Sequence, residues 1–200
     1  MQMRSLIAAV FALCLVGSPA FAHIGLGQTE TLSTGFFHPL GGLDHALAMV
    51  AVGLYAASLG GSAVWLIPAT FVGTMVVGGA LGFAGLPLPY VEQGIGLSVV
   101  VMGVAIAFGV KLPTAITMGL VGLFALFHGH AHGSEGAKLT AFLPYAAGFV
   151  VATTVLHVSG ITLGLSFDRL GSAPSAFLRQ AAGTIGAIAG VSFLAGWFPT

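Results

Sequence analysis

Residues 114–132 read TAITMGLVGLFALFHGHAH, an apolar run of membrane-spanning length that ends in three closely spaced histidines. The hydrocarbon core of a bilayer is about 30 Å thick, so a spanning helix needs about 20 consecutive apolar residues. The run therefore predicts a transmembrane helix with imidazole groups at one end. Because ionisable side chains are costly in a bilayer unless they face a partner, an ion or water, these histidines mark a candidate functional site.

The rest of the chain has the same apolar character. Hydrophobic residues make up 57% of its 200 residues and charged residues 5%, with a mean hydropathy of +1.06. Soluble domains carry about 25% charged residues. The composition thus predicts a membrane protein whose partner is the lipid bilayer. A formal net charge of zero, with five Lys and Arg, excludes the clustered positive charge that nucleic-acid binding requires.

Residues 1–22 predict a cleavable secretory signal peptide. A basic residue precedes an apolar stretch over residues 6–16, and residues 20–22 form an A-x-A cleavage site. Cleavage would leave His23 as the mature N-terminus; an uncleaved first helix is the alternative. Cys14, the single cysteine, lies in this segment, so the mature protein is expected to have no disulfide and no thiolate ligand.

Residues 23–200 predict one all-α domain, a polytopic bundle of about six transmembrane helices. Short connections predict that consecutive helices are antiparallel neighbours. Glycines three or four residues apart indicate close helix packing and also allow a homo-oligomer. The candidate spans are Phe36–Leu59, Ser62–Ala84, Val91–Val110, Thr114–His132, Leu139–Phe167 and Ala176–Phe198.

The distribution of charge predicts the orientation of these spans. A signal peptide places the mature N-terminus outside, and six spans return the C-terminus to the same side. Lys111, Arg169 and Arg179 then lie at inner loops and their flanks, as the positive-inside rule requires. We therefore expect a multi-pass protein of a bacterial inner membrane.

The first predicted span contains a cluster of candidate metal ligands. His38 and His45 are seven residues apart and lie on the same face of a continuous helix. Asp44 either completes a ligand set or accepts a hydrogen bond from an imidazole and so fixes its tautomer. Met49 lies one turn beyond His45 and offers a thioether ligand, although packing is the more common role of methionine.

A second cluster ends the fourth predicted span. His128 and His132 are separated by one helical turn, and Glu135 follows on the same face if the helix continues. His130 is expected on a different face of that helix. Histidine and carboxylate without thiolate suit a divalent ion such as Ni²⁺, Co²⁺ or Zn²⁺. We therefore favour metal binding over purely structural hydrogen bonding here.

Two further histidines stand alone. His157 lies in the middle of the fifth predicted span, where it is either satisfied by a neighbouring helix or acts as a relay ligand for an ion in transit. His23, if cleavage occurs, offers an imidazole and a free α-amine as a chelate at the entrance; a disordered terminus is the alternative.

The chain resembles the HupE/UreJ family, which is associated with hydrogenase and urease gene clusters. The resemblance covers the whole chain and includes a signal peptide that ends just before a histidine. Its motifs are His38-Pro39-x-x-Gly42-x-Asp44-His45-x-x-x-Met49, Phe127-His128-x-x-Ala131-His132-Gly133-x-Glu135 and Leu156-His157-x-x-Gly160. His130 falls outside these motifs.

The resemblance implies secondary uptake of nickel, and of cobalt in some members, for metalloenzyme maturation. The first motif is also similar to the His-x4-Asp-His signature of larger nickel/cobalt permeases, but here five residues separate His38 from Asp44. The ligand geometry of that larger family is therefore not transferred. The positions that the HupE/UreJ resemblance implies are His38, Asp44, His45, Met49, His128, His132, Glu135, His157 and His23.

The leading functional prediction is a permease for Ni²⁺ or Co²⁺ that holds no permanent cofactor and is not an enzyme. The chain has no P-loop motif for ATP hydrolysis and no His-Glu-x-x-His motif of metalloenzymes. A membrane accessory protein that binds a metal or a b-type haem without transport is the alternative. The sequence leaves open which of Ni²⁺, Co²⁺ and Zn²⁺ is preferred.

Overall fold

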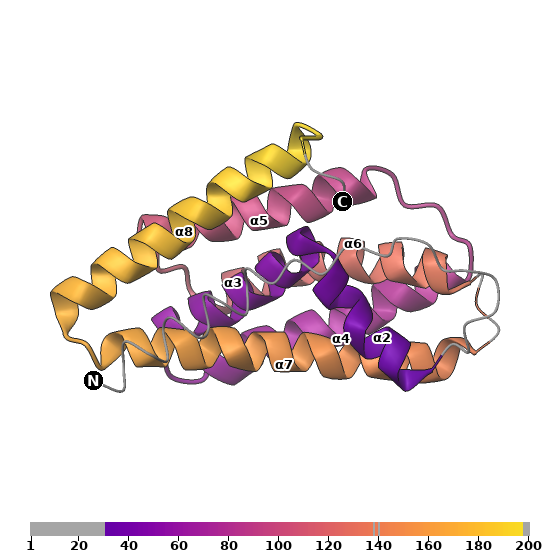
Figure 1. Cartoon of the computed structure of the whole chain (residues 1–200), viewed down its shortest axis with the longest axis horizontal. Coiled ribbons are helices and arrows are strands. Elements are labelled where there is room, and N and C mark those ends of the chain that lie inside the picture. The colour runs from indigo at the N-terminus through magenta and orange to yellow at the C-terminus, as the bar shows by residue number, and fades with distance from the viewer. Residues whose placement is uncertain (1–30, 138, 140, 198–200) are drawn as a thin grey trace.

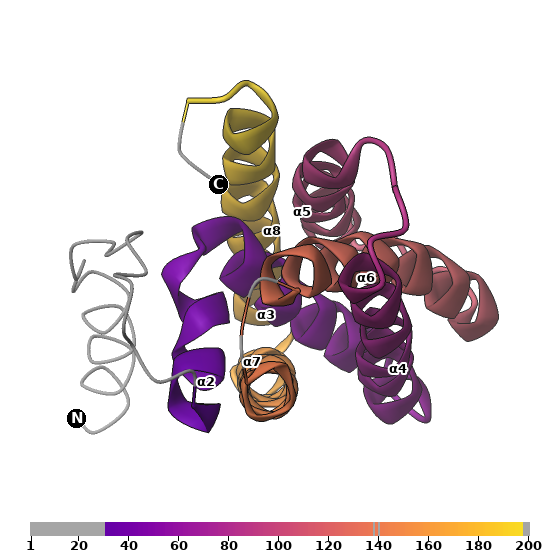
Figure 2. The same cartoon turned by 90° about the vertical axis from the view of Figure 1, so that its right-hand side faces the viewer.

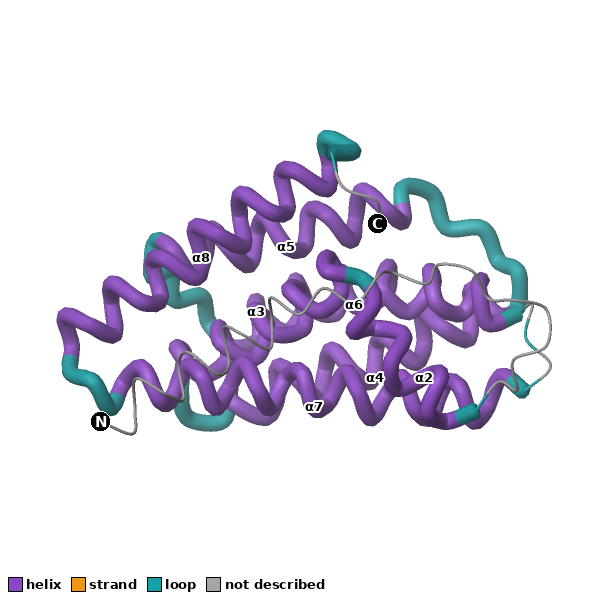
Figure 3. Tube along the Cα trace, in the orientation of Figure 1, coloured by secondary structure: helices purple, strands orange, loops and turns teal. Residues whose placement is uncertain are grey.

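The computed structural model describes residues 31–137, 139 and 141–197. Within these residues the fold is entirely helical, as predicted, with seven helices joined by loops (Figures 1 and 3). The predicted signal peptide and His23 lie outside the described residues. The helices are α2 (Leu32–Gly41), α3 (Leu43–Leu59), α4 (Ala63–Phe83), α5 (Val91–Ala107), α6 (Thr114–Gly136), α7 (Phe142–Asp168) and α8 (Ser172–Leu194).

The helices are suited to a membrane by length and composition. Of the described helices, α4, α6, α7 and α8 are each long and apolar enough to span a bilayer, and α2 and α3 together pass the same test as a bent pair. The apolar helix α5 has 17 residues and is therefore about 25 Å long at 1.5 Å per residue. Large apolar side chains such as Trp65, Leu143 and Phe177 point outward, which is typical of a lipid-facing surface.

The predicted single helix over residues 36–59 is wrong. α2 ends at Gly41 and α3 begins at Leu43, and their axes differ by 88°. The residue between them, Gly42, has an extended backbone with φ −100° and ψ 114°. A Cβ there would lie 2.9 Å from Asp44 Oδ1 and 3.3 Å from His45 Nδ1, so glycine makes room for the next two polar side chains. His38 and His45 therefore lie on different helices.

Helices that are not consecutive in the sequence form the closest pairs, so the prediction that consecutive helices are neighbours holds only in part. The most extensive contacts join α4 to α6, α5 to α8 and α3 to α7, while α2 packs mainly on α7. Figure 2 shows α5 beside α8 and α4 beside α6. Glycines allow these approaches: Gly129 of α6 lies against the Met75 backbone of α4, and Gly53 of α3 lies against the His157 backbone of α7.

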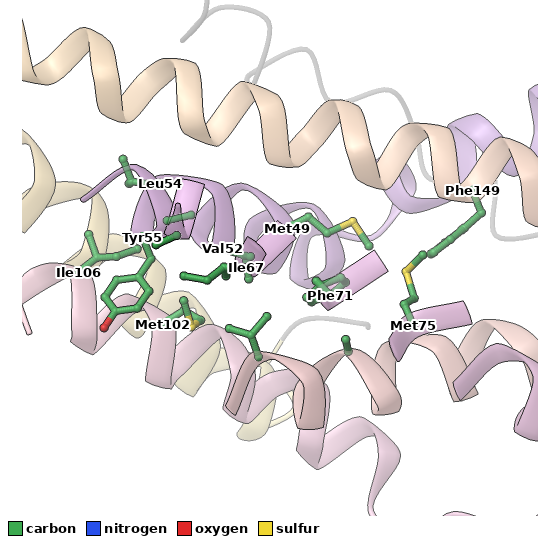
Figure 4. Close-up of a cluster of buried hydrophobic side chains, with 14 residues drawn as sticks. Met49, Val52, Leu54, Tyr55, Ile67, Phe71, Met75, Met102, Ile106 and Phe149 are labelled. Atoms are coloured by element: carbon green, nitrogen blue, oxygen red, sulfur yellow. The ribbon is translucent and has the colours of Figure 1, made fainter. Parts of the chain in front are cut away.

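A hydrophobic core lies where these pairs meet. Met49 of α3, Phe71 and Met75 of α4 and Phe149 of α7 belong to one buried cluster (Figure 4). Met49 is fully buried within it, which agrees with the packing role that methionine usually has. Burial of this cluster holds the α3–α7 and α4–α6 pairs together, and the polar side chains of the candidate site lie beside it.

Candidate metal site

Five of the predicted site residues come together from three helices. α2 contributes His38, α3 contributes His45, and α6 contributes His128, His132 and Glu135. The described part of α6 continues as a helix to Gly136, which confirms the predicted alignment of its three side chains. The imidazole rings form a row in which the ring centroids of His38 and His132 are 4.9 Å apart, those of His132 and His45 4.4 Å, and those of His45 and His128 4.9 Å.

The row begins at the surface and ends in the interior. The side chain of Glu135 is 57% exposed and that of His38 33% exposed, whereas His132 and His45 are nearly buried and His128 is fully buried. A ligand arriving from solvent would therefore meet the carboxylate and His38 first. The remaining imidazoles lie deeper in the protein.

The exposed end of the row is a candidate cation site. Oε2 of Glu135 lies 3.2 Å from Nε2 of His38 and 3.2 Å from Nδ1 of His132. One ligand atom from each of these residues can be chosen so that all three lie within 4.8 Å of one another. Two imidazole nitrogens and one carboxylate oxygen form a donor set that suits a divalent ion of the first transition row.

The buried part of the row leaves one nitrogen of each imidazole without a partner. Nδ1 of His45 donates to Oδ1 of Asp44 at 2.9 Å, and Nδ1 of His132 donates to Glu135, because a carboxylate can only accept. Among the described residues, no hydrogen-bond partner is found for Nε2 of His45, Nε2 of His132, Nδ1 of His128 or Oδ2 of Asp44. An orphaned buried polar atom costs about 1–3 kcal/mol.

These orphaned atoms share one chemical property. A neutral imidazole whose N–H is held by a hydrogen bond presents a lone pair at its other nitrogen, and a carboxylate oxygen also presents lone pairs. Histidine ligands of metals usually donate their second nitrogen to a carboxylate or carbonyl in this way. Electron-pair donors of this kind suit a cation, so the buried row belongs to the same candidate site.

His157 contacts the same buried aromatic ring as His128, that of Phe71. The Phe71 ring centroid is 5.5 Å from that of His128 and 4.9 Å from that of His157, and Phe71 is almost fully buried. Neither nitrogen of His157 has a hydrogen-bond partner among the described residues. The structure thus gives no support to the alternative of a histidine satisfied by a neighbouring helix.

His130 stands apart from the row, as the sequence indicates. Its Nε2 lies 2.7 Å from the carbonyl oxygen of Leu86, in the connection between α4 and α5, and its Nδ1 lies 3.5 Å from Oγ of Ser134. Both contacts are structural hydrogen bonds, so His130 serves as an internal comparison for the other histidines of α6.

Two residues of this region have no feature in the sequence that marks them as part of a site. Ser98 of α5 contacts His128, with Oγ 3.1 Å from Nε2, and Phe71 contacts both His128 and His157. A serine or a phenylalanine in an apolar helix is ordinary. Only the pairing of helices, which the sequence does not reveal, brings these two residues to the histidines.

An all-helical bundle with a lipid-facing apolar surface and a buried row of imidazoles defines a multi-pass membrane protein with a candidate cation site. The family model described as HupE / UreJ protein matches residues 11–193 of the chain. Protein HupE of Rhizobium leguminosarum bv. viciae is 47% identical over 192 residues, which cover 96% of this chain and 98% of that relative. The chain therefore belongs to the HupE/UreJ family. No solved structure matches it.

Proposed function

We propose that this protein is a secondary permease that takes up a divalent transition metal, with Ni²⁺ as the leading substrate and Co²⁺ as the second. The observation that carries the proposal is the row of buried imidazoles, each with one ring nitrogen that has no hydrogen-bond partner among the described residues. Family membership supports it, since the HupE/UreJ resemblance implies nickel uptake for metalloenzyme maturation.

Entry begins at the exposed donor set of His38, His132 and Glu135. The carboxylate attracts the hydrated cation, and imidazole nitrogens replace water molecules as the ion loses its hydration shell. The ion then passes from His132 to His45 and His128, whose rings follow in sequence. Neighbouring weak sites suit transport because an ion must be able to leave each one.

His157 is the inward ligand of this path. His157 and His128 both contact the ring of Phe71, and in the proposed path this apolar ring forms the boundary between the outer donors and the inner one. A buried apolar barrier between two donor groups prevents a continuous column of water, which would leak protons and other ions. Small displacements of Phe71 would then allow the metal to pass.

The proposed orientation places Glu135 outside. Lys111 precedes α6 and Glu135 lies at its other end, and Lys111 lines the same cavity as Asp168 and Arg179. Basic residues at this opposite end agree with an inner face by the positive-inside rule. An inside-negative potential of 100 mV favours entry of a divalent cation by about 4.6 kcal/mol, so uptake needs no ATP.

Uptake of radioactive ⁶³Ni²⁺ at submicromolar concentration into cells that express the chain tests the proposal. The comparison is His45→Gln against His130→Gln, where the second variant keeps an N–H donor for the Leu86 carbonyl. We expect His45→Gln to abolish uptake and His130→Gln to retain it, with excess Co²⁺ competing. If neither the wild type nor His130→Gln exceeds background at confirmed expression, the accessory function without transport replaces the permease.

A further inference from the structure

The side chains of Ser98 and His128 form a buried hydrogen bond between two helices. Ser98 lies on α5 and is 2% exposed, while His128 on α6 is fully buried. Oγ of Ser98 is 3.1 Å from Nε2 of His128 and 2.6 Å from the carbonyl oxygen of Ile95. We propose that Ser98 is a positioning residue that holds His128 as the Nε2–H tautomer, so that Nδ1 is its metal-binding atom. This inference rests on the proposed function of the histidine row.

The assignment follows from counting protons. A serine hydroxyl has one proton, and the Ile95 carbonyl oxygen can only accept, so the 2.6 Å contact uses the hydroxyl proton of Ser98. The contact with His128 then requires the imidazole to donate through Nε2–H and the serine oxygen to accept. A neutral imidazole carries one proton, and therefore Nδ1 of His128 presents a lone pair.

The opposite tautomer satisfies fewer groups. If the Ser98 hydroxyl donated to Nε2, the proton of His128 would sit on Nδ1, for which no acceptor is found among the described residues. A buried N–H without an acceptor is among the rarest and costliest arrangements in proteins. The Nε2–H tautomer makes both contacts and leaves unpaired only an acceptor, which a metal ion can satisfy.

Ser98 thus accepts a hydrogen bond from His128, as Asp44 does from His45. In both cases a neighbouring oxygen accepts one imidazole N–H and leaves the second nitrogen for the cation. The difference is charge: a carboxylate makes His45 the more basic ligand, whereas a neutral hydroxyl leaves His128 the weaker one. Two adjacent ligands of unequal strength would let the ion move from one to the other, because neither would bind it too tightly for release.

Nitrogen-15 NMR of the purified full-length protein, labelled at histidine, tests the tautomer directly. His128→Asn identifies the His128 resonances by their disappearance. We expect the Nε2 shift of His128 to be of the protonated, pyrrole type and the Nδ1 shift to be of the unprotonated, pyridine type. A pyridine-type Nε2 would overturn the inference.

Titration with Zn²⁺, a diamagnetic probe, tests the ligand atom in the same sample. We expect Zn²⁺ to move the Nδ1 resonance of His128 while Nε2 remains protonated. If Zn²⁺ moves the Nε2 resonances of His45 and His132 but not Nδ1 of His128, the inference fails and the proposed function stands. If Zn²⁺ moves none of these resonances, both fail.

A matched pair of serine variants tests the positioning role. Ser192 on α8 is also buried, at 6% exposure, and its hydroxyl donates to the Ile188 carbonyl at 2.9 Å. We expect Ser98→Ala to weaken Ni²⁺ binding about tenfold, in the range found when partners of metal ligands are removed, and Ser192→Ala to leave it unchanged. Equal affinities of the two variants would overturn the positioning role.

Discussion

Nδ1 of His45 lies 2.9 Å from Oδ1 of Asp44, the preceding residue, and both side chains are buried. This contact between consecutive residues is possible because Gly42, the residue before Leu43, has no side chain to occupy the space. The carboxylate orients the imidazole and makes its other nitrogen a stronger donor. Gly42 therefore lies between α2 and α3 and also leaves room for the Asp44–His45 pair.

Asp44→Asn is predicted to weaken Ni²⁺ binding by 10- to 100-fold, the usual effect of losing the acceptor behind a metal-binding histidine. The amide keeps the shape of the carboxylate but removes its charge. Isothermal titration calorimetry of the detergent-solubilised protein measures the change. Asp168→Asn, at the opposite end of the bundle, is the control and should bind as the wild type does. An Asp44→Asn affinity within twofold of the wild type would contradict the role.

The variant His157→Leu distinguishes the binding of Ni²⁺ from its transport across the membrane. His157 is not one of the three residues of the outer donor set, so its loss should leave the Ni²⁺ affinity of the solubilised protein within twofold and reduce ⁶³Ni²⁺ uptake at least tenfold. Ser159→Ala on the exposed side of the same helix is the control and should change neither quantity. Normal uptake by His157→Leu would remove this residue from the path.

The variant Glu135→Gln tests whether Ni²⁺ enters at the outer donor set of His38, His132 and Glu135. Glu135 is the exposed acid of the outer donor set, and the loss of its charge should raise the Ni²⁺ concentration needed for half-maximal uptake about tenfold while the maximal rate changes less. The control is Glu92→Gln, because Glu92 is an exposed acid in the first turn of α5. Concentration series of uptake for both variants give the comparison. An unchanged half-saturation in Glu135→Gln would place entry elsewhere.

Part of this structure is predictable because it depends on local sequence patterns. The apolar runs indicate the helices to within a few residues at most boundaries, as for α4, predicted as Ser62–Ala84 and found as Ala63–Phe83. The alignment of His128, His132 and Glu135 needs only the helical repeat and the continuation of α6. The hydrogen bond from His45 to Asp44 is one of the two roles that the sequence indicates for that carboxylate.

The remainder depends on contacts between distant segments. Consecutive glycines at 41 and 42 are compatible with a helix as well as with a break, so the 88° bend has no decisive local signal. Nearly every helix is apolar and glycine-rich, and the sequence therefore does not show that α5 pairs with α8 and α4 with α6. Phe71 meets His128 through the α4–α6 pair, and Ser98 meets His128 where α5 contacts α6.

Two glycines of α6 give a test of the pairing itself. A Cβ on Gly129 would collide with the backbones of Met75 and Gly79 on α4, whereas a Cβ on Gly119 meets nothing within 4 Å. Gly129→Ala should lower the thermal unfolding midpoint by several degrees, as overpacking costs about 1–3 kcal/mol, and should weaken Ni²⁺ binding because it displaces the neighbouring His128. Gly119→Ala should leave the midpoint unchanged or raise it slightly, since alanine favours helix over glycine by about 1 kcal/mol. The unfolding midpoints of both variants are compared in one detergent: equal midpoints would mean that α4 and α6 do not meet at Gly129, and the contact of His128 with Phe71 of α4 would fall with it.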